Sequence, residues 1–505
     1  MKALFLILLS LLASICPVQS IRADVFVWPE ASPEAVDIDP GMISDLVAAI
    51  ERGDYGRLKS LLIARHGRLV LEQYFNGYRP GDLMPLYSVT KSWASALIGI
   101  GIGRQHIPTP DRTIDQLFPD YADIFAAEPE KRLIRLHDLL TMRHGLQWDE
   151  WSSYFTDPAN PVYQMTQSSD WWRYVLSRPA TAPHDSNFRY STGVSNLLGG
   201  VIWNLTGQSA LNYSIEHLFD PMDIRDYYLE VDLAGQPRGT GIREFQPGLT
   251  PTGHGLWLKA TDLAKIGQLY LDRGAWQSRR ILSREWIEES WGEYSNFVSD
   301  PLVFPENVSY GYQWWTRHYP RPGGDIAVHT ADGFAGQYIF VIPELDMVIA
   351  STADNGQYEG PDMRFAIRDI ILDGVDADFD PVSDGGLTGS WFNTERKHQG
   401  FMLEVVPSTG QVVIYWMTFE PATGKQQWMV AVGQLHGRRA VLEFLQPTGG
   451  SFTGEGEATL GAWGDVELIF LSCTRARMNF FSEIDGVQGE IELQRLTPVT
   501  TCTED

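Results

Sequence analysis

Basic residues are scarce in this chain relative to acidic ones. Its 505 residues include 39 lysines and arginines against 64 aspartates and glutamates, so the formal net charge is −25 at pH 7. A surface of this sign repels the phosphates of nucleic acids and anionic lipid headgroups. The composition therefore argues against nucleic acid and anionic membranes as partners.

Cysteine is also rare, and Cys16, Cys473 and Cys502 are the only three. Cys16 lies in an N-terminal segment that we expect to be removed, which leaves two cysteines in an exported chain. An even number is compatible with one disulfide, between Cys473 and Cys502. Two buried free thiols are the alternative.

Long apolar runs are missing after the first residues, so we predict no transmembrane helix. The N-terminus has one lysine and then an apolar stretch to about Ile15, which is too short to span a bilayer comfortably and is typical of a secretory signal. Small or apolar residues favour cleavage after Ser20 or Ala23. A lipid anchor on Cys16 is disfavoured by the large Ile15 before it.

Removal of residues 1–23 takes away Lys2 and Arg22 and no acid, which changes the net charge from −25 to −27. The mature protein would be more acidic still. We expect it to be periplasmic or secreted.

The size of the chain and its 44% apolar composition allow two or more domains with filled cores. Helical and strand patterns alternate over residues 33–372, and a turn-rich acidic stretch follows. After residue 385 the pattern consists of short apolar runs separated by turns, as in 401–406 and 411–419, which is typical of β-hairpins. We predict a signal peptide at 1–23, a first domain at 24–375, a linker at 376–385 and an all-β sandwich or barrel at 386–505.

Within the first domain, strand patterns occur at both ends and helical patterns lie between them. Residues 63–71 predict two strands around a turn, and residues 337–350 predict another pair. Helices are expected at 88–101 and 261–273. This arrangement indicates an α+β or mixed α/β domain whose sheet unites the two ends of the segment.

Two catalytic motifs are missing. No Gly-x-Ser-x-Gly elbow occurs anywhere, which excludes the main competing form of serine catalysis. There is no His-Glu-x-x-His, and the histidines are scattered, so metal chemistry has no sequence support and we expect no metal or cofactor.

One serine does precede a lysine at a useful spacing, in Ser88-Val89-Thr90-Lys91. Residues three apart share a helix face, and the first turn of a helix carries unpaired N–H groups and a partial positive charge. Lys91 can therefore serve as the base that activates Ser88, provided that burial keeps its amine neutral. The alternative is a helix-capping serine with a solvated lysine nearby.

Six sequence blocks resemble one family, the serine hydrolases built like penicillin-binding proteins and class C β-lactamases, especially the esterase and 6-aminohexanoate-dimer-hydrolase-like branch. The resemblance covers about residues 35–372. The blocks are YSVTKSWASALIGIGI (87–102), LHDLLTMRHGLQWDE (136–150), FRYSTGVSNLLGGVI (188–202), GLWLKATDLAKIGQLYLDRGAW (255–276), YGYQWW (310–315) and ADGFAGQYIFVIPELDMVIAST (331–352).

The resemblance implies a β-lactamase/transpeptidase-like domain with a central antiparallel sheet and a helical subdomain. It implies that Ser88 is the acylated nucleophile, that Lys91 is its base, and that Tyr190 relays protons to and from Ser88 and the leaving group. It also implies an oxyanion hole made by the backbone N–H of Ser88 and one from Ala331 or Asp332.

The chain departs from the penicillin-recognising members at two places. Thr192 stands where they have asparagine, and Val328-His329-Thr330-Ala331 stands where they have Lys-Thr-Gly. Neither a bidentate amide partner nor a carboxylate-binding lysine is present, which favours ester or simple amide substrates over β-lactams. His329 is a candidate for the third-box position, and a structural histidine is the alternative.

Aromatic segments near the motifs can contribute to a substrate pocket. Trp148-Asp149-Glu150 and Trp171-Trp172 lie in segments that approach the cleft in relatives, although tryptophan usually packs in cores. The two acids could also attract a cationic amine.

The C-terminal region has three candidate carbohydrate-contacting tryptophans, Trp416, Trp428 and Trp463, and none of the catalytic groups. It is expected to be a stabilising or dimerising appendage, or a module that contacts an envelope polymer.

Taken together, these features predict an exported serine hydrolase that acts on a small ester or amide through an acyl-enzyme. The alternatives are a D-amino-acid peptidase or weak β-lactamase of the same fold, and a catalytically silent envelope-binding protein.

Overall fold

The computed structural model describes most of the chain in fourteen segments. They are residues 26–229, 247–277, 279–297, 307–319, 325–356, 360–372, 375, 386–393, 398–406, 408–436, 439–449, 458–470, 473–482 and 484–497. The expected signal peptide at 1–23 and the expected linker at 376–385 lie outside the described residues, and so do Cys16 and Cys502. Cys473 is buried and disulfide-bonded, so it is not a free thiol.

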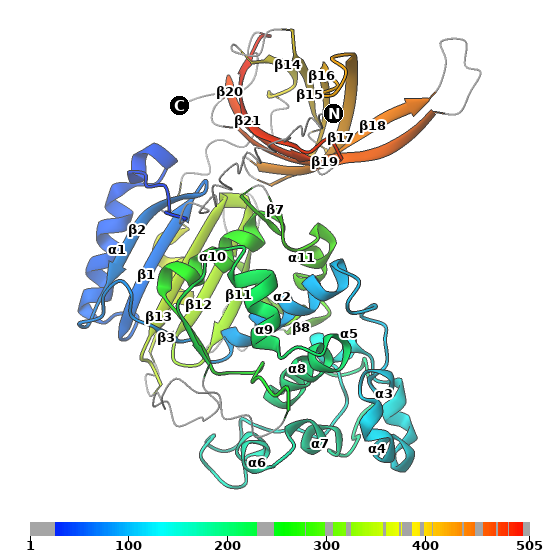
Figure 1. Cartoon of the computed structure of the whole chain (residues 1–505). Coiled ribbons are helices and arrows are strands. Elements are labelled where there is room, and N and C mark those ends of the chain that lie inside the picture. The colour runs from blue at the N-terminus through cyan, green and yellow to red at the C-terminus, as the bar shows by residue number, and fades with distance from the viewer. Residues whose placement is uncertain are drawn as a thin grey trace, which may run out of the picture.

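The first region is built on an eight-stranded antiparallel sheet, in the order β2-β1-β13-β12-β11-β10-β9-β8 (Figure 1). Its strands are β1 (Leu58–Arg65), β2 (Arg68–Tyr74), β8 (Ser295–Phe297), β9 (Asn307–Tyr310), β10 (Trp315–Tyr319), β11 (Ile326–Gly333), β12 (Gln337–Ile342) and β13 (Met347–Ala353). β1 pairs with β13 in the register Ile63 to Ile349, which confirms that the sheet unites strands from both ends of the segment.

Both faces of this sheet are buried, as the alternation along β12 demonstrates. Ile339 and Val341 belong to one apolar core, and Phe340 and Ile342 belong to another. Alternate residues of a strand point to opposite faces, so helices must cover both sides. The helices α2 (Val89–Gly103), α10 (Ala260–Leu271) and α11 (Arg284–Ser290) cover the first, and α1 (Pro40–Arg52) and α12 (Met363–Ala366) with η6 (Ile367–Ile371) cover the second.

A helical subdomain lies between α2 and α10 in the sequence and packs against α2 (Figure 1). Its α-helices are α3 (Ile114–Leu117), α4 (Ala122–Ala127), α5 (Leu136–Leu140), α6 (Pro161–Gln167), α7 (Trp171–Leu176), α8 (Thr192–Thr206) and α9 (Ala210–Ser214). Besides η6, the first region as a whole contains the short helices η1 (Pro33–Val36), η2 (Pro119–Tyr121), η3 (Pro129–Leu133), η4 (Ile215–Phe219) and η5 (Pro343–Leu345). Short strands form two further small sheets: β3 (Met84–Pro85), β4 (Tyr227–Leu229) and β5 (Leu256–Leu258) in one, and β6 (Ala275–Trp276) and β7 (Arg279–Arg280) in the other. None of the helices among the described residues is long and apolar enough to cross a membrane.

The C-terminal region is a closed barrel, which decides between the expected sandwich and barrel. Its strands are β14 (Gly389–Phe392), β15 (Gly400–Val406), β16 (Gln411–Phe419), β17 (Gln426–His436), β18 (Arg439–Gly449), β19 (Ala458–Phe470), β20 (Arg475–Ser482) and β21 (Val487–Arg495). Each strand pairs with the next, and β14 pairs with β21 to close the sheet. Closure leaves no unpaired edge strand.

Side chains fill the interior of the barrel. Along β16, Val412, Ile414 and Trp416 point inward into its core. Of the three tryptophans expected as candidate ligand contacts, Trp416 and Trp463 are buried and only Trp428 is substantially exposed, at 48%.

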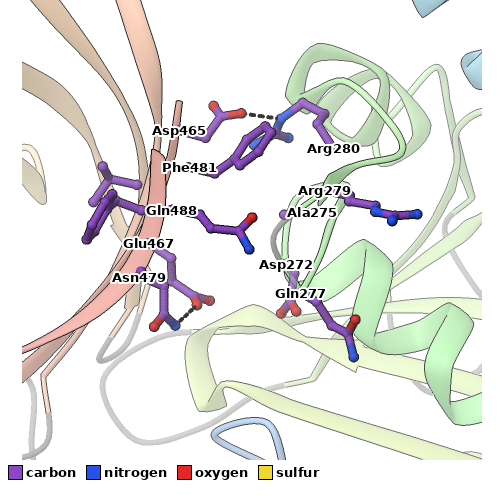
Figure 2. Close-up of a pocket in the computed structure, with 13 residues that line it drawn as sticks. Asp272, Ala275, Gln277, Arg279, Arg280, Asp465, Glu467, Asn479, Phe481 and Gln488 are labelled. Atoms are coloured by element: carbon purple, nitrogen blue, oxygen red, sulfur yellow. Dashed lines mark hydrogen bonds and ion pairs between the residues drawn. The ribbon is translucent and has the colours of Figure 1, made fainter. Parts of the chain in front are cut away.

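The barrel contacts the first region beside β7 (Figure 1). Arg280 donates a hydrogen bond from Nε to Oδ2 of Asp465 on β19 at 2.7 Å. A cavity of about 310 Å³ lies at this boundary. It is lined by residues of the first region, including Asp272 and Arg279, and by residues of the barrel, including Glu467 and Gln488 (Figure 2). Among the described residues that line it there is no serine, cysteine or histidine, and we interpret it as a gap between the two regions.

Candidate active site

Ser88 lies at the N-terminal end of α2, directly after a tight turn. Tyr87 has a left-handed backbone (φ 46°), and the N–H of Val89 donates to the carbonyl of Leu86 at 3.1 Å. A non-glycine residue in this conformation is uncommon and is often found where function requires it. The turn places the Ser88 hydroxyl at the start of a helix whose remaining residues are almost all buried.

Lys91 lies one turn further on, and its amine contacts Ser88. Nζ donates to Ser88 Oγ at 3.0 Å, to Thr192 Oγ1 at 3.1 Å and to the carbonyl of Gly253 at 2.7 Å. The residue is 2% exposed. Burial lowers the pKa of Lys91 to about 8, and the negative charge of Glu150 opposes this shift. A substantial fraction of the amine is therefore neutral near pH 8 and able to accept a proton.

Tyr190 completes the set that the sequence predicted. Its ring lies beside Lys91, with Nζ 4.8 Å from the ring centroid. Burial and the charge of Glu150 raise the pKa of Tyr190 well above its ordinary value, and a side-chain hydrogen bond with Ser88 acts in the opposite direction. The phenol is therefore protonated at neutral pH and can supply a proton. The structure brings Ser88, Lys91 and Tyr190 together from two separate segments.

The backbone of β11 passes close to this set. β10 pairs with β11 only as far as Thr330, so Ala331 and Asp332 continue beyond it and pair only with β12. A Cβ placed on Gly333 would lie 2.4 Å from the carbonyl oxygen of Leu86, so the end of β11 lies directly against the turn before Ser88. Within the described part of the chain, the Ser88 N–H has no hydrogen-bond acceptor.

The side chains of the third-box candidates point in different directions. His329 stacks on Trp291 with ring centroids 4.0 Å apart and shares a hydrogen bond with Thr316 at 2.9 Å. It does not line the cavity beside Ser88, and this placement favours the structural alternative. Asp332 does line it and accepts a hydrogen bond from the buried Arg317 at 2.8 Å.

A cavity of about 620 Å³ opens beside Ser88. Most of its wall is aromatic or apolar, and a polar part at one side holds Arg317, Asp332 and Arg364. The aromatic and apolar residues are Tyr87, Trp151, Phe155, Val162, Phe188, Tyr190, Trp315 and Phe334, and the cavity is also lined by Ser88, Thr192 and His254. Its volume and lining suit an apolar acyl or alkyl group.

Of the aromatic residues that line the cavity, the sequence singled out Tyr190, but the tryptophans that it named as pocket candidates lie elsewhere. Trp148, Trp171 and Trp172 are buried in the core and do not line the cavity. Trp151, three residues after Trp148, does line it and contacts the Tyr190 ring, with the ring centroids 5.5 Å apart. Its position beside the WDE segment was the only available signal.

Glu150 does not offer its charge to a substrate, contrary to one of the sequence interpretations. It is 1% exposed, and its carboxylate accepts hydrogen bonds from the indole of Trp148 and from the backbone and side chain of Thr192. Asp149 is exposed and accepts hydrogen bonds from Ser152.

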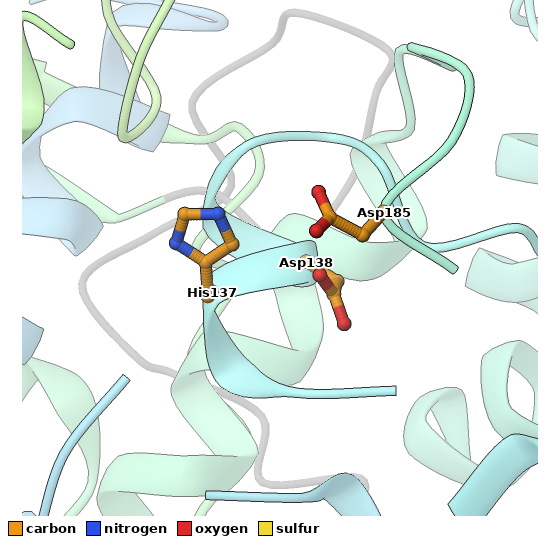
Figure 3. Close-up of side chains that lie close together, drawn as sticks. All are labelled: His137, Asp138 and Asp185. Atoms are coloured by element: carbon orange, nitrogen blue, oxygen red, sulfur yellow. The ribbon is translucent and has the colours of Figure 1, made fainter. Parts of the chain in front are cut away.

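One group of potential metal ligands occurs among the described residues, formed by His137, Asp138 and Asp185 (Figure 3). Arg135 lies 3.1 Å from an oxygen of each aspartate, and Arg143 lies 3.2 Å from Asp185. Both carboxylates are therefore already engaged by guanidinium groups. We interpret the three residues as part of an ion-pair network beside α5.

Comparisons with known proteins identify relatives of this chain. A family model described as Beta-lactamase matches residues 55–372. The 6-aminohexanoate-dimer hydrolase of Paenarthrobacter ureafaciens is 25% identical over 320 residues, which cover 60% of this chain and 74% of that protein.

Solved structures share the fold. A putative 6-aminohexanoate-dimer hydrolase from Bacillus anthracis superimposes with a TM-score of 0.53 at 20% identity, over 69% of this chain and 87% of the other. EstCE1, described as a hydrolase with promiscuous acyltransferase activity, superimposes with a TM-score of 0.50 at 18% identity, over 67% of this chain and 99% of the other.

Proposed function

Because the chain belongs to the beta-lactamase family, we propose that it is an exported serine hydrolase that cleaves ester or simple amide bonds. The observation that carries the proposal is the contact between Lys91 Nζ and Ser88 Oγ at 3.0 Å, made by an amine that burial keeps partly neutral. A positioned base is what a serine hydroxyl needs to become a nucleophile.

In the proposed reaction, Ser88 Oγ forms a bond to the substrate's carbonyl carbon while its proton moves to neutral Lys91. The π electrons of the carbonyl move to its oxygen, which backbone N–H groups of Ser88 and of Ala331 or Asp332 stabilise. The bond to the leaving group then breaks, and Tyr190 passes a proton to that group. The Lys91 ammonium returns its proton to Tyr190, which restores both groups. Water then attacks the acyl carbon and gives a proton to neutral Lys91. The bond from the acyl carbon to Ser88 Oγ breaks, Lys91 returns that proton to Oγ, and the acid is released.

The aromatic wall of the cavity supports an apolar acyl or alkyl group in the substrate. Trp151, Phe155 and Phe334 remove such a group from water, which contributes about 25 cal/mol per Å² of apolar surface buried. The names of the relatives, a 6-aminohexanoate-dimer hydrolase and a hydrolase with promiscuous acyltransferase activity, also support acyl transfer.

Thr192 and the missing third-box lysine support an ester or amide over a β-lactam. The Thr192 hydroxyl donates a hydrogen bond to Glu150 and accepts one from Lys91 Nζ. A threonine side chain also has no amide group to offer to a ligand. Val328 and His329 place no ammonium group in the cavity beside Ser88.

Export is proposed from the sequence of residues 1–23, which has one lysine followed by an apolar stretch. A contact between the barrel and an envelope polymer remains a prediction, and Trp428 is the exposed tryptophan that it would use.

The test is hydrolysis of a p-nitrophenyl ester series beside nitrocefin by residues 24–505 and by the Ser88→Ala variant. We expect ester turnover that the variant loses, with nitrocefin unchanged by either protein. Nitrocefin turnover that depends on Ser88 would favour a weak β-lactamase or D-amino-acid peptidase instead. Equal activity in both proteins would remove Ser88 from the reaction, and failure of a fluorophosphonate probe to label Ser88 would favour a binding protein.

A further inference from the structure

A buried carboxylate lies behind the catalytic lysine. Glu150 belongs to the loop between α5 and α6 and is 1% exposed. A charged group in such a position is costly unless hydrogen bonds or an opposite charge compensate it. Glu150 has both, because three donors reach it and Lys91 lies close enough to affect its pKa.

The three hydrogen bonds favour the ionised form of Glu150. The indole N–H of Trp148 and the backbone N–H of Thr192 both donate to Oε2, and neither group can accept a proton in return. The Thr192 hydroxyl donates to Oε1 at 2.8 Å. Burial raises the pKa of Glu150, while Lys91 and these hydrogen bonds oppose the rise.

Thr192 connects this carboxylate to the lysine. Its hydroxyl has a single proton, and that proton is directed to Glu150. The Thr192 oxygen must therefore act as acceptor toward Lys91 Nζ, which lies 3.1 Å away. A continuous chain of hydrogen bonds runs from Ser88 through Lys91 and Thr192 to Glu150.

We propose that Glu150 is a positioning residue for catalysis, which orients Thr192 and stabilises the ammonium form of Lys91 that arises when Ser88 gives up its proton. This inference rests on the proposed function. The role resembles that of the acidic member of a Ser-His-Asp triad, which orients the base and stabilises its cation without accepting the proton. In this proposal Thr192, which stands where penicillin-recognising relatives have asparagine, links Lys91 to Glu150.

The other titratable groups that face Lys91 do not supply this negative charge. Tyr190 precedes α8 and is a neutral phenol, since burial raises its pKa. His254 precedes β5, and burial lowers its pKa to about 3, so it is a neutral imidazole. Gly253, next to His254, contributes only its carbonyl.

The experiment compares Glu150→Gln with Asp149→Asn in the full mature chain. Both substitutions remove one negative charge from adjacent positions in the same loop, but Asp149 is exposed and bonded to Ser152. The readout is kcat/KM for a p-nitrophenyl ester as a function of pH. We expect Glu150→Gln to lower kcat/KM on the order of 100-fold and to move the acidic limb to lower pH, because Lys91 loses the charge that raises its pKa. Asp149→Asn should match the wild type.

The inference would be overturned if the acidic limb of the kcat/KM profile of a folded Glu150→Gln protein lies at the same pH as in the wild type, provided that Ser88→Ala is inactive. If Ser88→Ala keeps full activity, the proposed function fails instead. Should Glu150→Gln not fold, Thr192→Ser and Thr192→Val decide the question. The serine retains the hydroxyl and should retain activity, whereas the valine should lose about 10-fold or more; equal activity of the two would overturn the inference.

Discussion

Lys91 illustrates how position changes the chemistry of a residue. In water a lysine is almost fully protonated at neutral pH and cannot accept a proton from serine. Here the side chain is 2% exposed, and the loss of hydration disfavours its charged form. The ammonium form is still stabilised in part by Glu150, so the shift stops short of what burial alone would produce.

This balance predicts the pH dependence of the reaction. Burial lowers the pKa of Lys91 to about 8, and only the neutral amine is a base, so kcat/KM should rise with pH to a plateau, with a midpoint near 8. The measurement is kcat/KM for a p-nitrophenyl ester from pH 5 to 10, corrected for spontaneous hydrolysis. A profile that is flat over this range would argue against Lys91 as the base.

At the scale of the element, the proposed oxyanion hole depends on the close approach of β11 to the turn before Ser88. Gly333 allows this approach because it has no Cβ, which would otherwise lie 2.4 Å from the Leu86 carbonyl oxygen. Backbone N–H groups stabilise an oxyanion only when they are held close to where it forms. A small displacement of β11 would therefore reduce the rate.

Gly333→Ala should accordingly lower kcat by about 100-fold, since a misplacement of about 1 Å can have such an effect. The control is Gly103→Ala at the end of α2, where an added Cβ would meet nothing within 4 Å. Steady-state kinetics and circular dichroism of both variants make the comparison. A Gly333→Ala protein with wild-type kcat would show that β11 is not part of the oxyanion hole.

At the scale of the whole molecule, the barrel has an apolar core separate from the two cores that flank the large sheet. Trp416 lies within that core, with its ring centroid 5.4 Å from Phe401 and 5.6 Å from Trp463. None of the described residues that line the cavity beside Ser88 comes from the barrel. Stability of the barrel and hydrolysis should therefore be separable.

Trp416→Ala should lower the free energy of unfolding of the barrel by about 3–5 kcal/mol, the usual effect of truncating a buried tryptophan. Trp428→Ala, on the exposed side of the neighbouring strand, should change it by about 0.5 kcal/mol or less. The two variants are compared by urea unfolding, followed by tryptophan fluorescence, and by ester turnover at 25 °C. If Trp416→Ala loses ester turnover as well as stability, the active site depends on the barrel.

Local patterns were enough to predict much of this protein. The strand patterns in 63–71 and 337–350 predicted strand pairs that the structure confirms as β1 with β2 and β12 with β13. The contact of Lys91 with Ser88 follows from a spacing of three residues at a helix start. Such features depend on neighbours in the chain, whose geometry is set by the backbone itself.

Other features were decided by tertiary structure alone. The cavity is lined by Trp151, from a loop of the helical subdomain, and by Arg317, from β10. These two residues are more than 160 residues apart in the sequence. Glu150 reaches Thr192, which also contacts Lys91, only because the Glu150 loop packs against the start of α8. The closure of the barrel likewise depends on the pairing of its first strand with its last. In each case the partners are far apart in the sequence, and the burial of apolar surface that drives them together is not directional, so no local pattern specifies which distant segments meet.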